Sequence, residues 1–302
     1  MSLKYLFAIA FLLKGNCLLG QVDCPVRKTY YNLAEALTQK DCVKDFSYRV
    51  RKKEVLSTRI RELTRLEMLD LKSNAFTYLP NEIGTLKRLN HLTLTENQLR
   101  RFPETIGRLT ALRFLQADQN ELVDLHPNIG NLHTLEVLDL DWNQLSALPA
   151  AIGSLTSLQI LSLAHNHLLS VPESLSQLQS LQILDLSYNE LQELPERFFE
   201  LAGAREINLS SNYLSVLPLF SGTAQRLITL NLSNNRLVAL PASIAGLKGL
   251  QVLLLSSNRL THLPMELAQL KSLKILFING NPIPEAELQA FKAVRPDLTL
   301  IH

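Results

Sequence analysis

Residues 181–195 read LQILDLSYNELQELP, and this segment contains the unit from which most of the chain is built. Leu181, Leu184 and Leu186 precede Asn189, and the same order of leucines and asparagine returns along the chain. The asparagine recurs every 23 residues without an insertion or deletion, at positions 74, 97, 120, 143, 166, 189, 212, 235, 258 and 281. Self-similarity at a fixed period of this length predicts a solenoid of stacked coils.

The second half of the unit is a Leu-Pro pair followed by an Ile-Gly-x-Leu segment, clearest at Ile83-Gly84 and Ile152-Gly153. The full pattern, LxxLxLxxNxLxxLPxxIGxL, resembles the leucine-rich-repeat family over residues 43–283. The resemblance implies an α/β solenoid, or horseshoe, with a parallel β-sheet on its concave side, helical or 3₁₀ segments on its convex side and a cap at each end. The residue pattern of the repeat is similar both to that of bacterial secreted leucine-rich-repeat proteins and to that of cytosolic Ras-group scaffolds.

The physical chemistry of the unit supports the same fold. The LxL alternation predicts a short strand with one face in the core and one in solvent. The repeated asparagine amide can donate to and accept from backbone groups that a buried turn leaves without partners. One unit cannot bury its apolar face alone, so the units must stack.

The chain divides into four parts by sequence. Residues 1–20 are expected to be a signal peptide, 21–42 an N-terminal cap with a short helix at Tyr31–Gln39, 43–283 one degenerate and ten regular repeats, and 284–302 a C-terminal cap that ends the solenoid. In the degenerate unit Arg51 replaces the asparagine. The repeat that begins at Ala204 departs from the pattern, and we expect a looser convex side there with Phe220 filling the gap.

Export is indicated by the first residues. Lys4 precedes the apolar run Tyr5–Leu13, and Gly20 is a small residue before a plausible cleavage point at Gln21. The alternative is an ordinary N-terminal helix of a cytosolic protein. An exported chain would retain Cys24 and Cys42, which permit one disulfide bond, whereas a reducing cytosol would leave two free thiols. Neither a lipid anchor at Cys17 nor a transmembrane segment is expected.

Overall charge argues against nucleic-acid binding, because the formal net charge is only +2. Charge is unevenly distributed, however. The degenerate repeat is basic, which indicates either a solvated capping face or a patch for an acidic partner or a membrane surface. From Phe114 to Glu196 there is no lysine or arginine, and the same window holds 11 Asp and Glu residues.

Binding is expected on the concave face, where equivalent positions of neighbouring strands form columns about 4.8 Å apart. The position before the asparagine is large and aromatic in the central repeats, and Trp142 is the only tryptophan. The candidate ligand-binding residues are Phe114, Asp118, Asp139, Asp141, Trp142, His165, Asp185 and Tyr188. Aromatic anchors and concentrated negative charge suit a basic or cationic protein or peptide. Alternatively, His165, Asp185 and Tyr188 are residues that this type of repeat commonly carries at these positions.

Catalytic and metal-dependent functions are less well supported by the sequence. Carboxylates on a flat sheet rarely surround a calcium ion, and no nucleophile elbow accompanies His165, Asp141 and Ser162. No phosphate loop or CxxC pair occurs. We therefore expect no metal, cofactor or catalytic residue, and a monomer. The leading hypothesis is an exported recognition protein, located outside the cytoplasm, and the alternative is a cytosolic signalling adaptor or scaffold.

Overall fold

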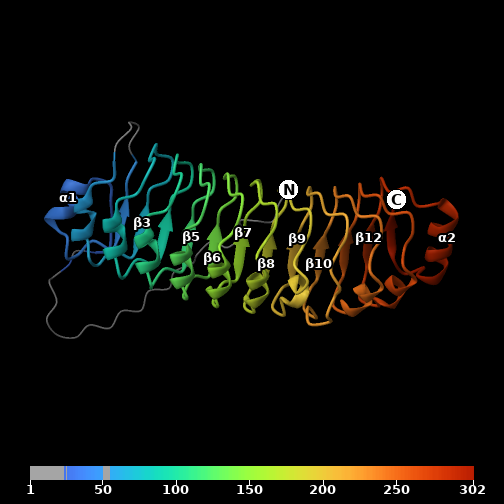
Figure 1. Ribbon diagram of the computed structural model, residues 1–302. Coiled ribbons are helices and arrows are strands. Elements are labelled where there is room, and N and C mark those ends of the chain that lie inside the picture. The colour runs from blue at the N-terminus through green and yellow to red at the C-terminus, as the bar shows by residue number, and fades with distance from the viewer. Residues whose placement is uncertain (1–23, 25, 50–54) are drawn as a thin grey trace.

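The computed structural model describes residues 24, 26–49 and 55–302. Their coils stack in a single curved row, with α1 at one end and α2 at the other (Figure 1). One 13-stranded sheet runs the length of the row, its strands in sequence order and all pairs parallel. The expected leucine-rich solenoid with a parallel sheet is therefore confirmed. The expected signal peptide and Arg51 lie outside the described residues.

The strands are short and evenly spaced. Leu138 pairs with Leu161, and Leu161 with Leu184, so the register advances by one 23-residue unit at each step. The strands are β1 (Thr29–Tyr30), β2 (Asp45–Ser47), β3 (Met68–Asp70), β4 (His91–Thr93), β5 (Phe114–Gln116), β6 (Val137–Asp139), β7 (Ile160–Ser162), β8 (Ile183–Asp185), β9 (Glu206–Asn208), β10 (Thr229–Asn231), β11 (Val252–Leu254), β12 (Ile275–Phe277) and β13 (Thr299–Ile301).

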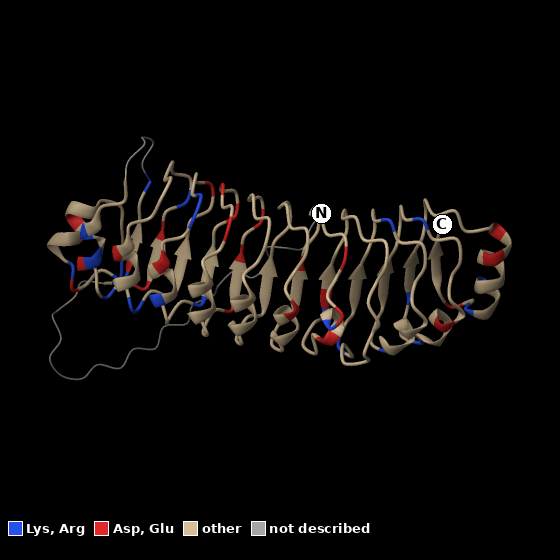
Figure 2. Ribbon diagram, viewed as in Figure 1, with Lys and Arg blue, Asp and Glu red and all other residues tan. Residues whose placement is uncertain are grey.

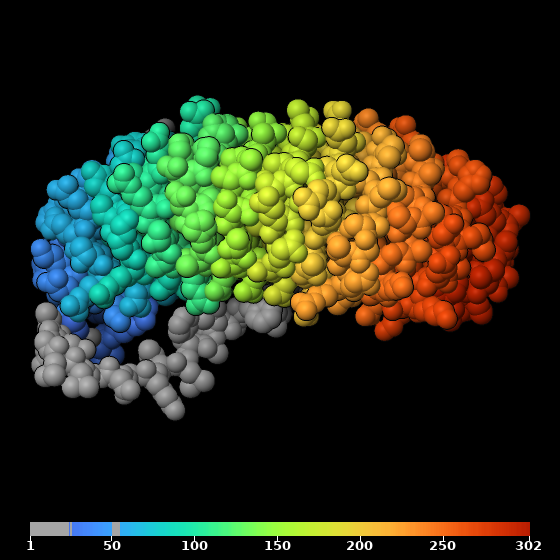
Figure 3. Space-filling model, turned by 60° about the horizontal axis from the view of Figure 1, so that its bottom comes forward, coloured from blue at the N-terminus to red at the C-terminus, as the bar shows by residue number. Residues whose placement is uncertain are grey.

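The opposite side of most coils is a single 3₁₀ turn, which usually follows the proline of the Leu-Pro pair. Neighbouring coils approach closely at this turn, and a glycine is needed there because a Cβ on Gly107 would clash with the carbonyl oxygen of Asn128. The turns are η1 (Thr58–Glu62), η2 (Asn81–Thr85), η3 (Glu104–Arg108), η4 (Pro127–Asn131), η5 (Ala150–Ser154), η6 (Glu173–Gln177), η7 (Phe198–Glu200), η8 (Ala242–Gly246) and η9 (Met265–Gln269). Figure 3 shows the coils as contiguous bands from end to end.

The repeated asparagines form a ladder that links successive coils. Asn166 is representative: its Nδ2 donates to the carbonyl oxygens of Leu163 at 3.1 Å and Leu140 at 2.9 Å, and its Oδ1 accepts from the amide of Leu145 at 3.0 Å. The same contacts recur at Asn143 and Asn189. Each side chain thus satisfies buried backbone groups in two adjacent coils, as its donor and acceptor inventory allows.

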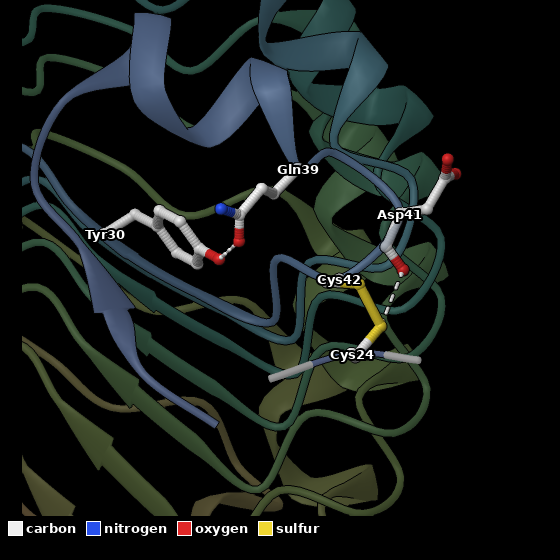
Figure 4. The surroundings of a disulfide bond; sticks show 5 residues. All are labelled: Cys24, Tyr30, Gln39, Asp41 and Cys42. Atoms are coloured by element: carbon white, nitrogen blue, oxygen red, sulfur yellow. Dashed lines mark hydrogen bonds between the residues drawn. A yellow bond between two sulfur atoms is a disulfide. The ribbon is translucent and has the colours of Figure 1, made fainter. Parts of the chain in front are cut away.

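The N-terminal cap closes the first coil. Asn32 accepts hydrogen bonds from the amides of Ala34 and Glu35, which starts helix α1 (Leu33–Thr38) within the predicted helical stretch. A disulfide bond joins Cys24 to Cys42, and nearby the Tyr30 hydroxyl donates to Gln39 at 2.6 Å (Figure 4). Strand β1, which extends the sheet at this end, was not predicted from the sequence.

The C-terminal cap is helix α2 (Glu285–Val294) followed by β13. Arg295, just after the helix, is buried, and its guanidinium donates to the carbonyl oxygens of Leu270 and Leu273 at 2.9 Å each. These carbonyls belong to the last regular coil. The arginine therefore satisfies acceptors that a further coil would otherwise reach, a role that the sequence did not reveal.

The coil between β9 and β10, all of which is described, lacks a 3₁₀ turn at the equivalent of η8. Phe220 is buried at this point, and its ring lies 4.2 Å from that of Phe199 in the preceding coil. The expectation that Phe220 fills this gap is confirmed. In the described part of the chain, no helix is long and apolar enough to cross a membrane.

Candidate functional site

The residue before each ladder asparagine has an unusual backbone. Nine of these residues have φ between 54° and 58°, in the left-handed region, and Gly280 occupies the tenth position with φ 74°. Left-handed geometry is uncommon for any residue other than glycine and rarer still for bulky side chains. Serine adopts the same left-handed geometry at Ser73, Ser211 and Ser257, so the backbone does not require a large side chain at this position.

Three consecutive coils nevertheless place rings there. The Trp142 and His165 rings are 3.6 Å apart between centroids, the His165 and Tyr188 rings are 4.2 Å apart, and both pairs are stacked within 10° of parallel. Trp142 is 56% exposed and Tyr188 is 53% exposed. We call these three residues the aromatic stack. It presents apolar surface to solvent at the ends of β6, β7 and β8.

The predicted aspartates differ from expectation in their exposure. We expected the residues between the leucines of each strand, such as Asp139 and Asp185, to face the concave solvent. Asp139, Asp141 and Asp185 are instead buried, with 4–7% of each residue exposed. Neighbouring strands lie close together, and the three carboxylates turn toward backbone amide groups instead of toward solvent. Only Asp118 stays half-buried, where it accepts a hydrogen bond from the Thr95 hydroxyl at 2.6 Å.

Two of the buried aspartates help to end their strands. Asp139 accepts from the amide of Asp141 at 3.1 Å, and Asp185 accepts from the amide and hydroxyl of Ser187 at 3.0 and 2.6 Å. The same contact from a residue to the amide two positions later occurs at Asp70, Asn208 and Asn231. Asp139 and Asp185 therefore share a repeated local hydrogen bond. Asp141 instead accepts from the Ala164 amide of the next coil at 2.7 Å.

A hollow of about 380 Å³ opens beside the aromatic stack. We call it the central hollow. It brings together six of the eight predicted residues, namely Asp118, Asp141, Trp142, His165, Asp185 and Tyr188, with Gln119, Ala164, Ser187 and Asn208. Phe114 and Asp139 are not among its lining residues. Three carboxylates and three aromatic rings thus meet in one concavity, a combination that suits a cationic group with an apolar stem.

Phe114 instead belongs to a column of apolar side chains at the strand starts. Its ring stacks on His91 at 4.3 Å, and the Arg113 guanidinium lies 5.4 Å from its centroid. Burial, assisted by the positive charge of Arg113, lowers the pKa of His91 below its ordinary value. The column continues across the sheet through Val137, Ile160 and Ile183.

A second concavity, of about 430 Å³, lies at the N-terminal end of the sheet and was not predicted. Its lining residues are Arg27, Thr29, Tyr31, Asp45, Phe46, Ser47, Arg49, Met68 and Asp70. Arg27 is held by a bidentate contact to Asp45, with both distances 2.6 Å. One side of this cleft is formed by Thr29 of β1 and the adjacent Arg27 and Tyr31, a segment that the sequence did not identify as a strand.

The electrostatic contrast along the solenoid is visible in the ribbon. From β5 to β8 the ribbon shows red segments and no blue ones, whereas both ends of the solenoid carry blue segments (Figure 2). Among the described residues, no group of three or more His, Cys, Asp or Glu side chains is arranged to hold a metal ion. The lining of the central hollow is acidic and aromatic.

Comparison with protein families gives matches over most of the chain. A family model described as "Leucine-rich repeat region" matches residues 41–146, and one described as "Leucine rich repeat" matches residues 157–214 and 225–283. Comparison with curated protein sequences gives no significant match.

Comparison with solved structures gives many matches. A plant peptide hormone receptor, RGFR1 in complex with RGF2, has 28% identity and a TM-score of 0.77 over 90% of this chain and 45% of its own. The structure of PEPR1–AtPEP1 has 30% identity and a TM-score of 0.76 over 91% and 40%. A Leptospira interrogans leucine-rich-repeat protein, LIC12759, has 27% identity and a TM-score of 0.52 over 92% and 100%. The chain spans less than half of the two former structures.

Proposed function

The chain belongs to the leucine-rich-repeat family, and from that premise we propose that it is a non-catalytic recognition protein that binds a basic segment of a protein or peptide in the central hollow. Fold alone does not specify a partner, so the proposal depends on the site. One similar structure is a plant peptide hormone receptor in complex with RGF2, which supports a protein or peptide as the class of ligand.

The observation that carries the proposal is the aromatic stack. Its backbone positions accept serine or glycine elsewhere in the same solenoid, so folding does not call for three rings there. The rings are half exposed, which leaves apolar area unburied. Large aromatic side chains that converge on one concavity are the residues that most often dominate binding energy.

Charge defines the class of ligand. Asp118, Asp141 and Asp185 line the hollow, and the sequence from Phe114 to Glu196, which supplies nearly all of its lining, contains no lysine or arginine. A lysine or arginine side chain of the ligand can place its charge among the carboxylates and its methylene stem against the rings. The apolar column of Val137, Ile160 and Ile183 lies on the strands beside the hollow and offers contact to neighbouring ligand residues.

The non-catalytic part of the proposal rests on how the aspartates are engaged. Asp139 and Asp185 accept hydrogen bonds from nearby backbone amides, and Asp141 accepts one from the next coil. These contacts hold each carboxylate as an acceptor in a fixed orientation. Fixed negative charge suits electrostatic recognition of a cation.

Export is the favoured location within this proposal. The Cys24–Cys42 disulfide is typical of proteins that fold outside the cytoplasm, and the N-terminal sequence is typical of a signal peptide. The alternative, a cytosolic adaptor or scaffold, predicts a chain that retains Met1 or Ser2. Sequencing the N-terminus of the protein purified from its natural source distinguishes the two, because export predicts a start at or near Gln21.

Binding is tested with an arrayed peptide library that contains lysine- and arginine-bearing nonapeptides and their glutamate-substituted counterparts. We expect the basic peptides to bind and the acidic counterparts not to bind. Trp142→Ser introduces the residue found at three equivalent positions, so the fold should be preserved. It is expected to weaken binding by at least about 1 kcal/mol, a rise in Kd of fivefold or more.

A second variant tests the charge, and two controls complete the design. Asp141→Asn keeps an oxygen that can accept from Ala164 but removes the negative charge, and it should weaken basic peptides selectively. Tyr78→Ser removes another half-exposed ring, and Asp124→Asn removes a half-exposed carboxylate that pairs with Arg101, both outside the hollow. Affinity that is unchanged in both hollow variants, or equally reduced in the controls, would contradict the proposal.

A further inference from the structure

One lateral side of the solenoid has a charge pattern that the concave site does not explain. Each regular coil returns to its strand through six residues of the form x-L-x-x-L-x, or a close variant. We call the ten such segments, from residues 62–67 to residues 269–274, the descending flank. They lie along the lower edge in Figure 1.

The flank is strongly biased toward positive charge. Its ten segments hold ten lysines and arginines but only four acidic residues, Glu62, Glu67, Glu136 and Glu200. All four acidic residues form ion pairs, with Arg59, Arg27 and Lys44, Arg113, and Arg197 respectively. Nine cations remain that have no ion-pair partner elsewhere in the described chain: Arg65, Lys87, Arg88, Arg108, Arg205, Arg226, Lys248, Lys271 and Lys274.

The opposite lateral side provides an internal comparison. There the exposed positions between each asparagine and the following Leu-Pro pair carry four arginines and four acidic residues, so they are balanced. Arg100 and Arg101 are also paired with Glu121 and Asp124. Several acidic residues of the convex side, including Glu82, Glu104 and Glu173, lie in the first turn of their 3₁₀ helices, whereas the flank begins at the last residue of those turns.

The cations are accessible and cluster toward the two ends. Eight of the nine are exposed, and Arg65 is half-buried. Four precede β5 and five follow β8, whereas the flank segments that lead to β6, β7 and β8 contribute no unpaired charge. In the first cluster the Lys87 ammonium donates to the backbone carbonyl of Arg108 at 2.8 Å, so two cations of adjacent coils lie side by side.

The flank is also even, because its segments are equal in length and none carries an insertion. Backbone hydrogen bonds join successive segments, for example from Arg113 to Asn90 at 2.9 Å, from Gln159 to Glu136 at 2.8 Å and from Lys274 to Gln251 at 2.9 Å. Figure 3 turns this side toward the viewer, and the described coils form a broad surface without a deep groove. With strands about 4.8 Å apart, the two clusters lie roughly 20 Å or more from each other.

We propose that the descending flank is a docking surface for an anionic lipid membrane. A planar surface can touch both clusters at once, and the attraction of basic residues to a negatively charged leaflet adds up without specific contacts. A single linear polyanion would have to cross the middle of the flank, where the segments that lead to β6, β7 and β8 offer no cation. A single nucleic-acid strand is usually held on stacking aromatic side chains, and the flank segments contain no phenylalanine, tyrosine or tryptophan.

The proposal is tested by co-sedimentation of the full chain with vesicles of phosphatidylcholine alone or with 30% phosphatidylserine. We expect binding only to the anionic vesicles and its loss when salt is raised from about 50 to about 300 mM, because salt screens surface charge. Each basic residue near such a surface strengthens binding about fivefold. The triple variant Lys87→Glu, Arg88→Glu, Arg108→Glu should therefore lower the vesicle partition coefficient by about a hundredfold or more.

A second variant tests the far cluster, and a third controls for net charge. Arg226→Glu, Lys248→Glu, Lys271→Glu should have a similar effect, since Arg226 and Lys248 occupy the same coil positions as Arg88 and Lys87. Arg101→Glu, Arg236→Glu, Arg259→Glu changes the net charge equally on the opposite side and should lower the partition coefficient less than about fivefold. Circular dichroism checks that all three variants fold.

Three outcomes would overturn the proposal. The full chain could fail to bind anionic vesicles at low salt. The opposite-side control could lose as much binding as the flank variants, which would reduce the effect to net charge. Binding to heparin beads without binding to vesicles would assign the flank to a linear polyanion. The peptide-binding assay is unaffected by each of these results, so the two proposals can fail separately.

Discussion

The asparagine ladder allows a stability prediction from a single buried side chain, Asn166→Ala. Asn166 is 4% exposed. Its removal leaves the amide of Leu145 and the carbonyls of Leu140 and Leu163 without these hydrogen bonds. A buried amide without a partner costs about 1–3 kcal/mol, and two under-satisfied carbonyls together add a similar amount. We therefore expect a loss of about 3–5 kcal/mol in the free energy of unfolding.

Asn281 is the matched control at the end of the ladder. It makes the equivalent contacts, to the carbonyls of Leu255 at 2.9 Å and Ile278 at 2.8 Å and from the amide of Leu260 at 3.0 Å. It is only half-buried, so water can reach some of these groups when the side chain is removed. We expect Asn281→Ala to cost about 1–2 kcal/mol.

Urea denaturation followed by circular dichroism measures both losses, with the slope of unfolding free energy against urea checked for each variant. A loss below about 1.5 kcal/mol for Asn166→Ala, or one no larger than that of Asn281→Ala, would refute the reasoning. In that case leucine packing alone would hold the coils in register.

Three further predictions concern other parts of the solenoid. Phe220→Ala should lower the free energy of unfolding by about 3–5 kcal/mol in urea denaturation, because a buried ring is deleted where no 3₁₀ turn can collapse into the space; a loss below 1 kcal/mol contradicts its filling role. Cys24→Ser should release the N-terminal cap, since a bond that spans 18 residues contributes about 3 kcal/mol; hydrogen exchange should accelerate in α1 and remain unchanged near β8. His91 has a lowered pKa in the folded chain, so the unfolded chain binds its proton first and stability should fall as pH drops below about 6.5; His91→Gln should lose that part of the slope, and an identical pH profile would contradict it.

The sequence predicted the fold well because its strongest signal is geometric. An asparagine in phase over ten coils determines the strand register, and the observed pairing of Leu138 with Leu161 and Leu184 follows directly from it. Strand β1 escaped prediction because two residues are too few to show alternation, and its pairing with β2 depends on the cap. The role of Arg295 escaped for a related reason: its acceptors lie more than 20 residues away in sequence.

The candidate site was predicted in composition but not in exposure. Alternation correctly placed Asp139 and Asp185 on the sheet face away from the leucines. It could not show that each carboxylate turns toward the amide two residues later, which makes it part of the strand end. The sequence pattern also did not reveal the left-handed backbone of Trp142. Serine adopts the same backbone geometry at three equivalent positions, and we therefore expect Trp142→Ser to keep the fold.

The two proposed surfaces occupy different sides of the same coil, and their charges are opposite. The central hollow is acidic and opens beside the strand ends, whereas the descending flank is basic and precedes the strand starts. A chain lying with its flank on an anionic bilayer would therefore keep the hollow open to a basic ligand. The same bilayer concentrates cations near its surface, so a basic peptide should be enriched close to the bound chain and its central hollow. Peptide affinity measured on phosphatidylserine vesicles should then be as high as in solution. A clear loss on vesicles would mean that the membrane covers the hollow, and that the flank is not the side on which the chain docks.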